Sequence, residues 1–129
     1  MNRLFYLSLT LLLLLILTLT ACGGPAGSAN AAPSVGNPDL GKKLFITTCV
    51  VCHGGDGQGL PGLGKNLVTS EFVAGQSDGD LVKFIKVGRT PDDPLNTTGV
   101  TMPPKGNNPA LTDEDLYNIV AYIRSLREE

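Results

Sequence analysis

The chain has 129 residues, a formal net charge of −2, three cysteines, one histidine and no tryptophan. This length accommodates one small domain with terminal extensions, and the absence of any basic run argues against nucleic-acid binding. A small domain poor in aromatic residues has a weak core and usually needs disulfides, a metal or a cofactor. Three cysteines cannot supply several disulfides, so a bound cofactor is the better explanation for the stability of this domain.

The first 21 residues have the layout of an export signal. Arg3 supplies a positive start, and residues 4–19 form a leucine-rich run slightly shorter than the roughly 20 residues that span a membrane. Small residues and a cysteine follow in Leu19-Thr20-Ala21-Cys22. This segment resembles a bacterial lipoprotein signal peptide, which implies lipid attachment to Cys22. The alternative is an uncleaved anchor with a free Cys22, and both interpretations place the protein on the extracytoplasmic side of the plasma membrane.

Residues 22–38 are rich in glycine, proline, alanine and serine. Such a composition is typical of a flexible tether, with a reach of roughly 20–25 Å. The folded domain is therefore expected over residues 39–129.

Three helices are predicted in this domain. The first begins at Pro38-Asp39, the second is opened by Ser77 and ended by Gly88, and the third is capped by Thr112. Glycine- and proline-rich loops over residues 54–66 and 88–111 separate them, and no hairpin pattern is evident. The sequence therefore predicts an all-α domain.

The segment Cys49-Val50-Val51-Cys52-His53 carries the chemistry. In an exported chain, C-x-x-C-H is typical of covalent attachment of a c-type haem, because two thiols at this spacing suit the two vinyl groups of one porphyrin. A thioredoxin-like redox pair would need a βαβ context, which is missing here. A zinc site needs about four ligands, but His53 is the only histidine and Cys22 is remote. The motif therefore favours one covalent haem c with its iron.

Residues 39–126 resemble a class I (mitochondrial-type) monohaem cytochrome c. The haem motif follows the first helix, the only internal methionine stands in Thr101-Met102-Pro103-Pro104, and a C-terminal helix ends the domain. The resemblance implies three main helices and long loops wrapped around one haem. It also implies His53 as the proximal iron ligand and Met102 as the distal one, with Lys105 as a remoter alternative.

Further positions match the family less specifically. The resemblance pairs Gly41 and Phe45 on the first helix with Ile119 and Tyr122 on the last. Lys65 stands where the family usually has a proline whose carbonyl accepts a hydrogen bond from the proximal imidazole. The family's propionate-binding tryptophan is missing. Arg89 is a candidate to replace it, and the alternative is that Arg89 is an ordinary surface arginine.

The function that this resemblance implies is one-electron transfer. A His/Met iron has no open position for a substrate, so we expect a carrier between membrane redox partners rather than an enzyme with a small-molecule substrate. One alternative is a fixed haem c subunit of a larger membrane oxidoreductase. Another is a five-coordinate haem sensor or enzyme, which would require Met102 to be off the iron.

Overall fold

A computed structural model describes residues 36–127. The expected signal peptide, Cys22 and most of the expected tether lie outside the described residues. Within residues 36–127 every regular element is helical, and two isolated bridges, Leu60 with Gly64 and Arg89 with Met102, stand in place of strands. The elements are α2 (Pro38–Thr48), α3 (Val50–His53), α4 (Glu71–Gly75), α5 (Asp78–Val87), the 3₁₀ turn η2 (Pro104–Asn107) and α6 (Asp113–Ser125). The prediction of an all-α domain is confirmed.

The three predicted helices begin at their capping residues. The Ser77 side chain accepts from the third backbone N–H of α5, and α5 ends at Gly88, which has a positive φ of 74°. At the start of α6, Thr112 and Asp115 cap each other's backbone N–H groups in a reciprocal capping box. The shorter elements α3, α4 and η2 were not predicted, because four or five residues show no helical periodicity. None of the helices in residues 36–127 is long and apolar enough to cross a membrane.

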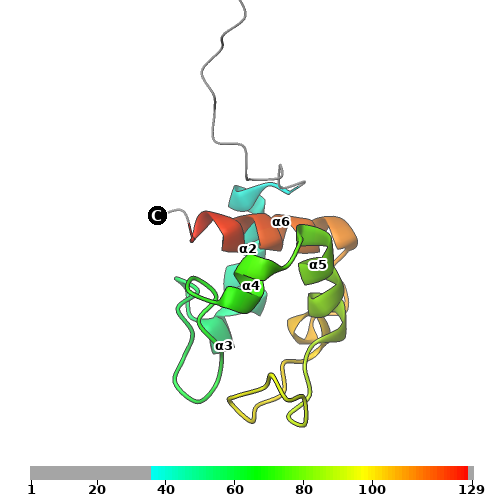
Figure 1. The fold of residues 1–129 in the computed structure, drawn as a ribbon. Coiled ribbons are helices and arrows are strands. Elements are labelled where there is room, and N and C mark those ends of the chain that lie inside the picture. The colour runs from blue at the N-terminus through cyan, green and yellow to red at the C-terminus, as the bar shows by residue number, and fades with distance from the viewer. Residues whose placement is uncertain (1–35, 128–129) are drawn as a thin grey trace, which may run out of the picture. The chain divides into compact units, whose positions relative to one another are not determined.

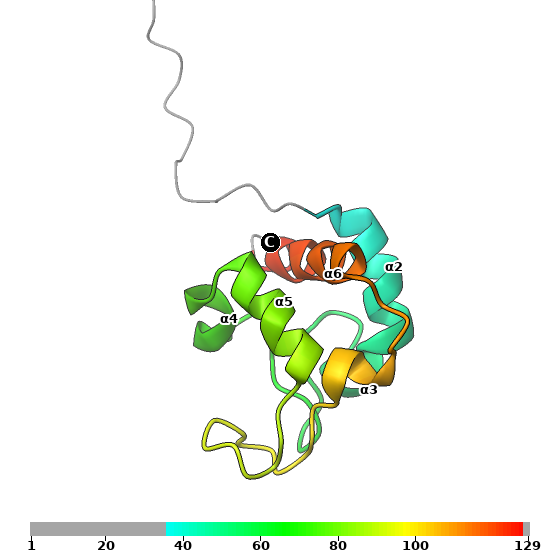
Figure 2. The same cartoon turned by 90° about the vertical axis from the view of Figure 1, so that its right-hand side faces the viewer.

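The core forms where α2 crosses α6 (Figures 1 and 2). Gly41 is buried at the crossing, and a Cβ atom there would overlap the Asn118 carbonyl. One turn later, Phe45 is fully buried and meets the Tyr122 ring edge-on, with ring centroids 5.3 Å apart. The predicted pairing of Gly41 and Phe45 with the last helix is therefore confirmed, although the backbone that lies against Gly41 begins at Asn118.

Two arginines near the end of α6 connect it to the middle of the chain. Arg124 forms an ion pair with Asp78, Nε to Oδ1 at 3.0 Å, and donates to two backbone carbonyls of the α4 segment at 2.6 Å each. Arg127 donates to the Leu67 carbonyl at 2.9 Å. These contacts fix the segment between α3 and α5 onto α6 although it contains only one short helix.

Substituting Gly41 tests whether the helix crossing depends on close backbone contact. Gly41→Ala is expected to lower the free energy of unfolding of the haem-loaded protein by about 2 kcal/mol, because the added methyl group forces α2 away from α6. Gly75→Ala is the matched control, since a Cβ at that helical position meets no atom within 4 Å. Chemical denaturation of both variants measures the difference, and equal stability would contradict the close-contact explanation.

Candidate functional site

A cavity of about 1000 Å³ lies among the helices and the two long loops. This volume is at the upper end of the range for small-molecule sites. Its walls include aromatic and aliphatic side chains from all five α-helices of residues 36–127. They also include Cys49, Cys52, His53 and Met102, so the structure brings together all four haem-site residues that were predicted within the domain. Cys22, the predicted lipid-attachment residue, lies outside the described residues.

Helix α3 presents the C-x-x-C-H motif to the cavity. Cys49 caps this single turn, and its carbonyl accepts from the N–H groups of Cys52 at 3.2 Å and of His53 at 3.0 Å. Residues three apart in a helical turn lie on the same side, so both thiols, which are free, face the same region. Burial, and secondarily the neighbouring Cys52, raises the pKa of the Cys49 thiol to about 11. Cys49 is therefore protonated at neutral pH.

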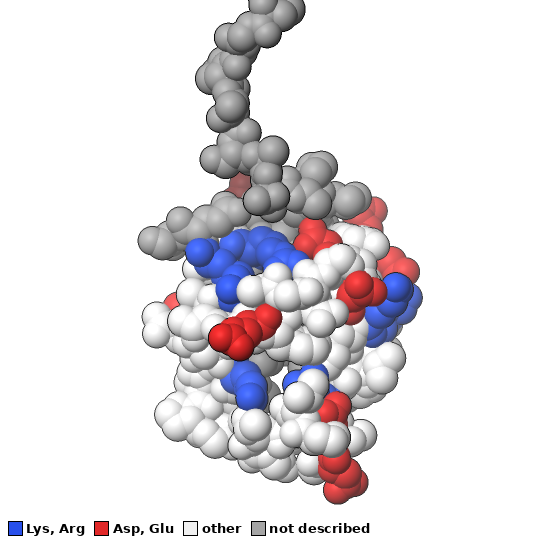
Figure 3. Space-filling view, viewed as in Figure 1, with Lys and Arg blue, Asp and Glu red and all other residues white. Residues whose placement is uncertain are grey.

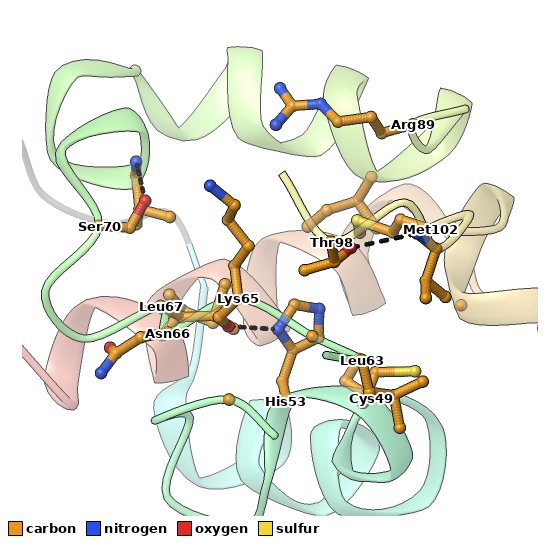
Figure 4. A pocket seen from close by; sticks show the side chains of 18 of the residues that line it. Cys49, His53, Leu63, Lys65, Asn66, Leu67, Ser70, Arg89, Thr98 and Met102 are labelled. Atoms are coloured by element: carbon orange, nitrogen blue, oxygen red, sulfur yellow. Dashed lines mark hydrogen bonds between the residues drawn. The ribbon is translucent and has the colours of Figure 1, made fainter. Parts of the chain in front are cut away.

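The His53 imidazole is oriented by a backbone carbonyl. Its Nδ1 lies 2.9 Å from the Lys65 oxygen (Figure 4), and because a carbonyl only accepts, Nδ1 carries the proton. Burial lowers the pKa of His53, and the hydrogen bond to Lys65 opposes this shift. The ring is therefore neutral at neutral pH, with the Nε2 lone pair available to a metal. The expected hydrogen bond is present although lysine replaces the family's usual proline.

Gly64 allows the carbonyl of Lys65 to come this close. A Cβ atom on Gly64 would overlap the Cys52 carbonyl, so the 60–65 loop packs directly against the backbone of the haem motif. The bridge between Leu60 and Gly64 closes this loop. The position of the His53 acceptor therefore depends on a glycine, and the Lys65 side chain takes no part.

Met102 approaches the cavity on the other long loop. Its backbone pairs with that of Arg89 through two hydrogen bonds of 2.8 and 2.9 Å. The two chain segments lie so close that a Cβ atom on Gly88, which precedes Arg89, would overlap the Met102 carbonyl. Figure 4 shows the Met102 side chain and the His53 imidazole entering the cavity from opposite sides. The Lys105 ammonium, the alternative ligand, donates instead to the Leu111 carbonyl at 2.7 Å.

Arg89 places a partly buried cationic side chain at the cavity. Its guanidinium carbon lies 4.8 and 4.7 Å from the ring centroids of Phe72 and Phe84, a cation–π arrangement. Nε lies 3.3 Å from the Asp93 carboxylate but is buried without a hydrogen-bond partner. Because the guanidinium is cationic and Arg89 lines the cavity, an anionic group bound there would be attracted to it.

The residues around the cavity fit a haem. A porphyrin has two vinyl groups, an iron and two carboxylates. The cavity offers two free thiols, an imidazole and a thioether on opposite sides, and the cationic side chain of Arg89. Together with the all-helical fold, this donor set defines a covalent haem protein.

Comparison with known proteins gives the family. The cytochrome c family model matches residues 38–127, and the chain belongs to this family. The predicted resemblance to a class I monohaem cytochrome c is thereby confirmed. Members of the family carry a covalently bound haem c with iron and transfer electrons, so haem c is the cofactor of this protein. No solved structure matches the chain.

Three relatives illustrate the range of proteins in which this domain occurs. The chain is 30% identical over 90 residues to the cbb3-type cytochrome c oxidase subunit CcoP of Azospirillum brasilense (68% of this chain, 30% of that protein). It is 29% identical over 115 residues to the cytochrome bc1 complex cytochrome c subunit of Mycobacterium tuberculosis (83% and 37%). It is 31% identical over 83 residues to cytochrome c-555 of Chlorobaculum thiosulfatiphilum (64% and 88%). The chain thus spans about a third of the two complex subunits and most of cytochrome c-555.

Two features of the site were not predicted from the sequence. After Met102, the Lys105 ammonium donates a hydrogen bond to the Leu111 carbonyl. Before Met102, the Asn96 side chain donates hydrogen bonds to two backbone carbonyls of its own loop. Asparagine is an ordinary turn residue, so nothing in the local pattern distinguishes Asn96 from other loop asparagines. Its role depends on contacts that exist only when the loop is folded.

The contact between the haem motif and residues 60–65 is tested by comparing two variants. We expect Lys65→Ala to leave exchange of the His53 Nδ1 proton unchanged, because only the backbone oxygen accepts the bond. Gly64→Ala is expected to speed this exchange about tenfold, because the new methyl group pushes the Lys65 carbonyl away. Proton NMR of the reduced, haem-loaded protein measures both rates. Slow exchange in Gly64→Ala would contradict the proposed dependence on close packing.

Proposed function

We propose that this protein is a one-electron carrier in which Cys49 and Cys52 hold the haem and His53 and Met102 ligate its iron. The observation that carries this proposal is the placement of an imidazole and a thioether on opposite sides of one cavity, beside two free thiols. Each thiol would add its S–H bond across one vinyl group, forming a C–S and a C–H bond with no change in electron count. When bound, the haem supplies reversible one-electron chemistry at iron.

The surrounding residues support a carrier rather than a catalyst. The hydrogen bond to the Lys65 carbonyl fixes the His53 ring and increases its basicity as a ligand. The soft thioether of Met102 would favour ferrous iron and would raise the reduction potential relative to a second histidine. If His53 and Met102 both hold the iron, no ligand position would be left for a substrate. We therefore favour electron transfer without catalysis.

Arg89 supports the proposed orientation of the haem. Arg89 lines the cavity, and its cationic guanidinium would form a charge-assisted hydrogen bond with a haem carboxylate. We propose that Arg89 binds a propionate, as the replacement for the tryptophan that this chain lacks.

Two kinds of electron-transfer partner are supported by different observations. The chain covers 88% of cytochrome c-555, a protein little longer than the matched domain, which favours a small mobile carrier. The names of the other relatives, subunits of a cbb3-type oxidase and of a bc1 complex, favour a fixed haem subunit. Purification in a mild detergent distinguishes them. A carrier is recovered alone because redox contacts are small and transient, whereas a subunit is recovered with its complex.

We further propose that a lipid on Cys22 anchors the protein outside the plasma membrane, with residues 22–38 as the tether. The leader sequence and the position of Cys22 support this arrangement. A tethered domain would meet membrane partners more often, because the anchor raises its effective concentration near them.

The axial ligands are tested by optical spectra of the haem-loaded protein. In the ferric state we expect the weak far-red sulfur-to-iron band, and in the ferrous state no reaction with carbon monoxide, because Met102 closes the iron. Met102→Ala is expected to lose the band and to bind carbon monoxide. Lys83→Met is the control, and it should keep the wild-type spectrum because Lys83 is exposed on α5 and does not line the cavity. A wild-type protein without the band that binds carbon monoxide would instead support a sensor or enzyme.

The anchor is tested by changing Cys22. Wild-type protein is expected in the membrane fraction, with the mass of two or more acyl chains at its amino terminus. Cys22→Ser is expected in the soluble extracytoplasmic fraction if the leader is processed elsewhere, or to remain an unprocessed precursor. Mass spectrometry and fractionation measure these outcomes. An unacylated wild-type protein that starts at Met1 would show that the leader is an uncleaved anchor.

A further inference from the structure

The segment between Arg89 and Met102 has no regular structure of its own. Residues 90–101 form only turns and bends, and the largest side chain among them, Leu95, is 57% exposed. An irregular loop of this length lacks the core contacts that fix a helix. Some other interaction must therefore hold this loop in the conformation that presents Met102.

The side-chain amide of Asn96 supplies that interaction. Its Nδ2 donates to the carbonyls of Thr90 at 2.9 Å and Val100 at 2.8 Å. Its Oδ1 accepts from the Thr98 N–H at 3.1 Å, the Thr98 hydroxyl at 3.1 Å and the Gly99 N–H at 3.0 Å. Both amide hydrogens and the amide oxygen are thus used within this one loop.

The positions of these partners determine what the amide does. Thr90 directly follows Arg89, and Val100 lies two residues before Met102, so the two donated hydrogen bonds join the two arms of the loop. The arms are joined again by the backbone bridge between Arg89 and Met102. Asn96 therefore closes the loop immediately beyond the bridge, where the backbone pairing itself ends.

Thr98 extends this contact toward the methionine. Its hydroxyl donates to Asn96 and accepts from the Val100 N–H at 3.3 Å. Figure 4 shows Thr98 next to Met102 at the cavity. The chain just before Met102 is thus held through both the carbonyl and the N–H of Val100.

From this geometry we propose that Asn96 is a positioning residue that holds the Met102 thioether at the iron. This inference rests on the proposed function, in which Met102 is the distal ligand. An amide suits the role because it donates two hydrogen bonds and accepts others from one rigid group. Opening of the loop would release Met102 from the iron. The hydrogen bonds of Asn96 would therefore lower the frequency with which the iron is exposed to an external ligand.

The experiment measures carbon monoxide binding to the reduced, haem-loaded protein. Asn96→Ala is expected to bind carbon monoxide at least about tenfold faster than wild type, because the loop opens more often once its two arms are no longer joined. The ferric far-red band should also disappear at a lower temperature. Asn108→Ala is the matched control on the other side of Met102, where the side chain accepts only one hydrogen bond, from Ala110.

A second variant keeps the test decisive if Asn96→Ala does not accumulate. Thr98→Val retains the shape of the side chain but removes the hydroxyl that links Asn96 to Val100, and it is expected to change the same two measurements in the same direction. If wild type keeps the band but the loop variants behave like Asn108→Ala, the role of Asn96 is refuted and Met102 ligation stands. If the wild-type protein itself lacks the far-red band, the proposed ligation of the iron by Met102 is refuted, and the role of Asn96 is refuted with it.

Discussion

The close contact of α2 with α6 is the constraint on which the site depends. Gly41 lets the two backbones meet at Asn118, and Phe45 fills the space one turn below against Tyr122. Because α2 leads directly into α3, this crossing also determines where the haem motif lies. Arg124 and Arg127 then attach the following segment to the same C-terminal helix. Figure 1 shows the two long loops extending from this helical frame.

The two sides of the cavity are held by different physical means. On the His53 side, one helical turn and one backbone carbonyl set the imidazole, and both belong to short segments packed against each other. On the Met102 side, a long loop is closed by a two-bond bridge and by the amide of Asn96. The hydrogen bonds that close the Met102 loop open with a smaller loss of free energy, because few apolar groups are buried with them. In the proposed carrier, the distal ligand is accordingly the one that can be lost.

The surface carries no dominant charge on the face shown in Figure 3, where acidic groups lie between basic ones. This distribution agrees with the small net charge of the chain. Long-range steering toward a strongly charged partner is therefore weak for this face. A tether that keeps the domain near the membrane would compensate for weak steering, which gives the proposed anchor at Cys22 a physical purpose.

Much of the fold could be predicted because its signals are local. Thr112 followed by three acidic residues is a local signal for the start of a helix, and Ser77 and Gly88 mark the two ends of α5 in the same way. The C-x-x-C-H motif is equally local, since adjacent residues supply the thiols and the imidazole. The short elements α3, α4 and η2 were missed because they are stabilised by neighbours distant in sequence. The carbonyls of the α4 segment that accept from Arg124 are one example.

The sequence by itself thus predicted the class of fold, the cofactor and the three residues of the haem motif, because each depends on residue type and short spacing. Met102 followed from the family resemblance and from its being the only internal methionine. Only the tertiary structure decided that Gly64 brings the Lys65 carbonyl against the haem motif, that the Arg89 guanidinium lies over Phe72 and Phe84, and that Asn96 joins the arms of its loop. These features arise from backbone groups and side chains that meet across irregular loops. Their positions follow from packing on α2 and α6, and no local pattern of residues encodes them.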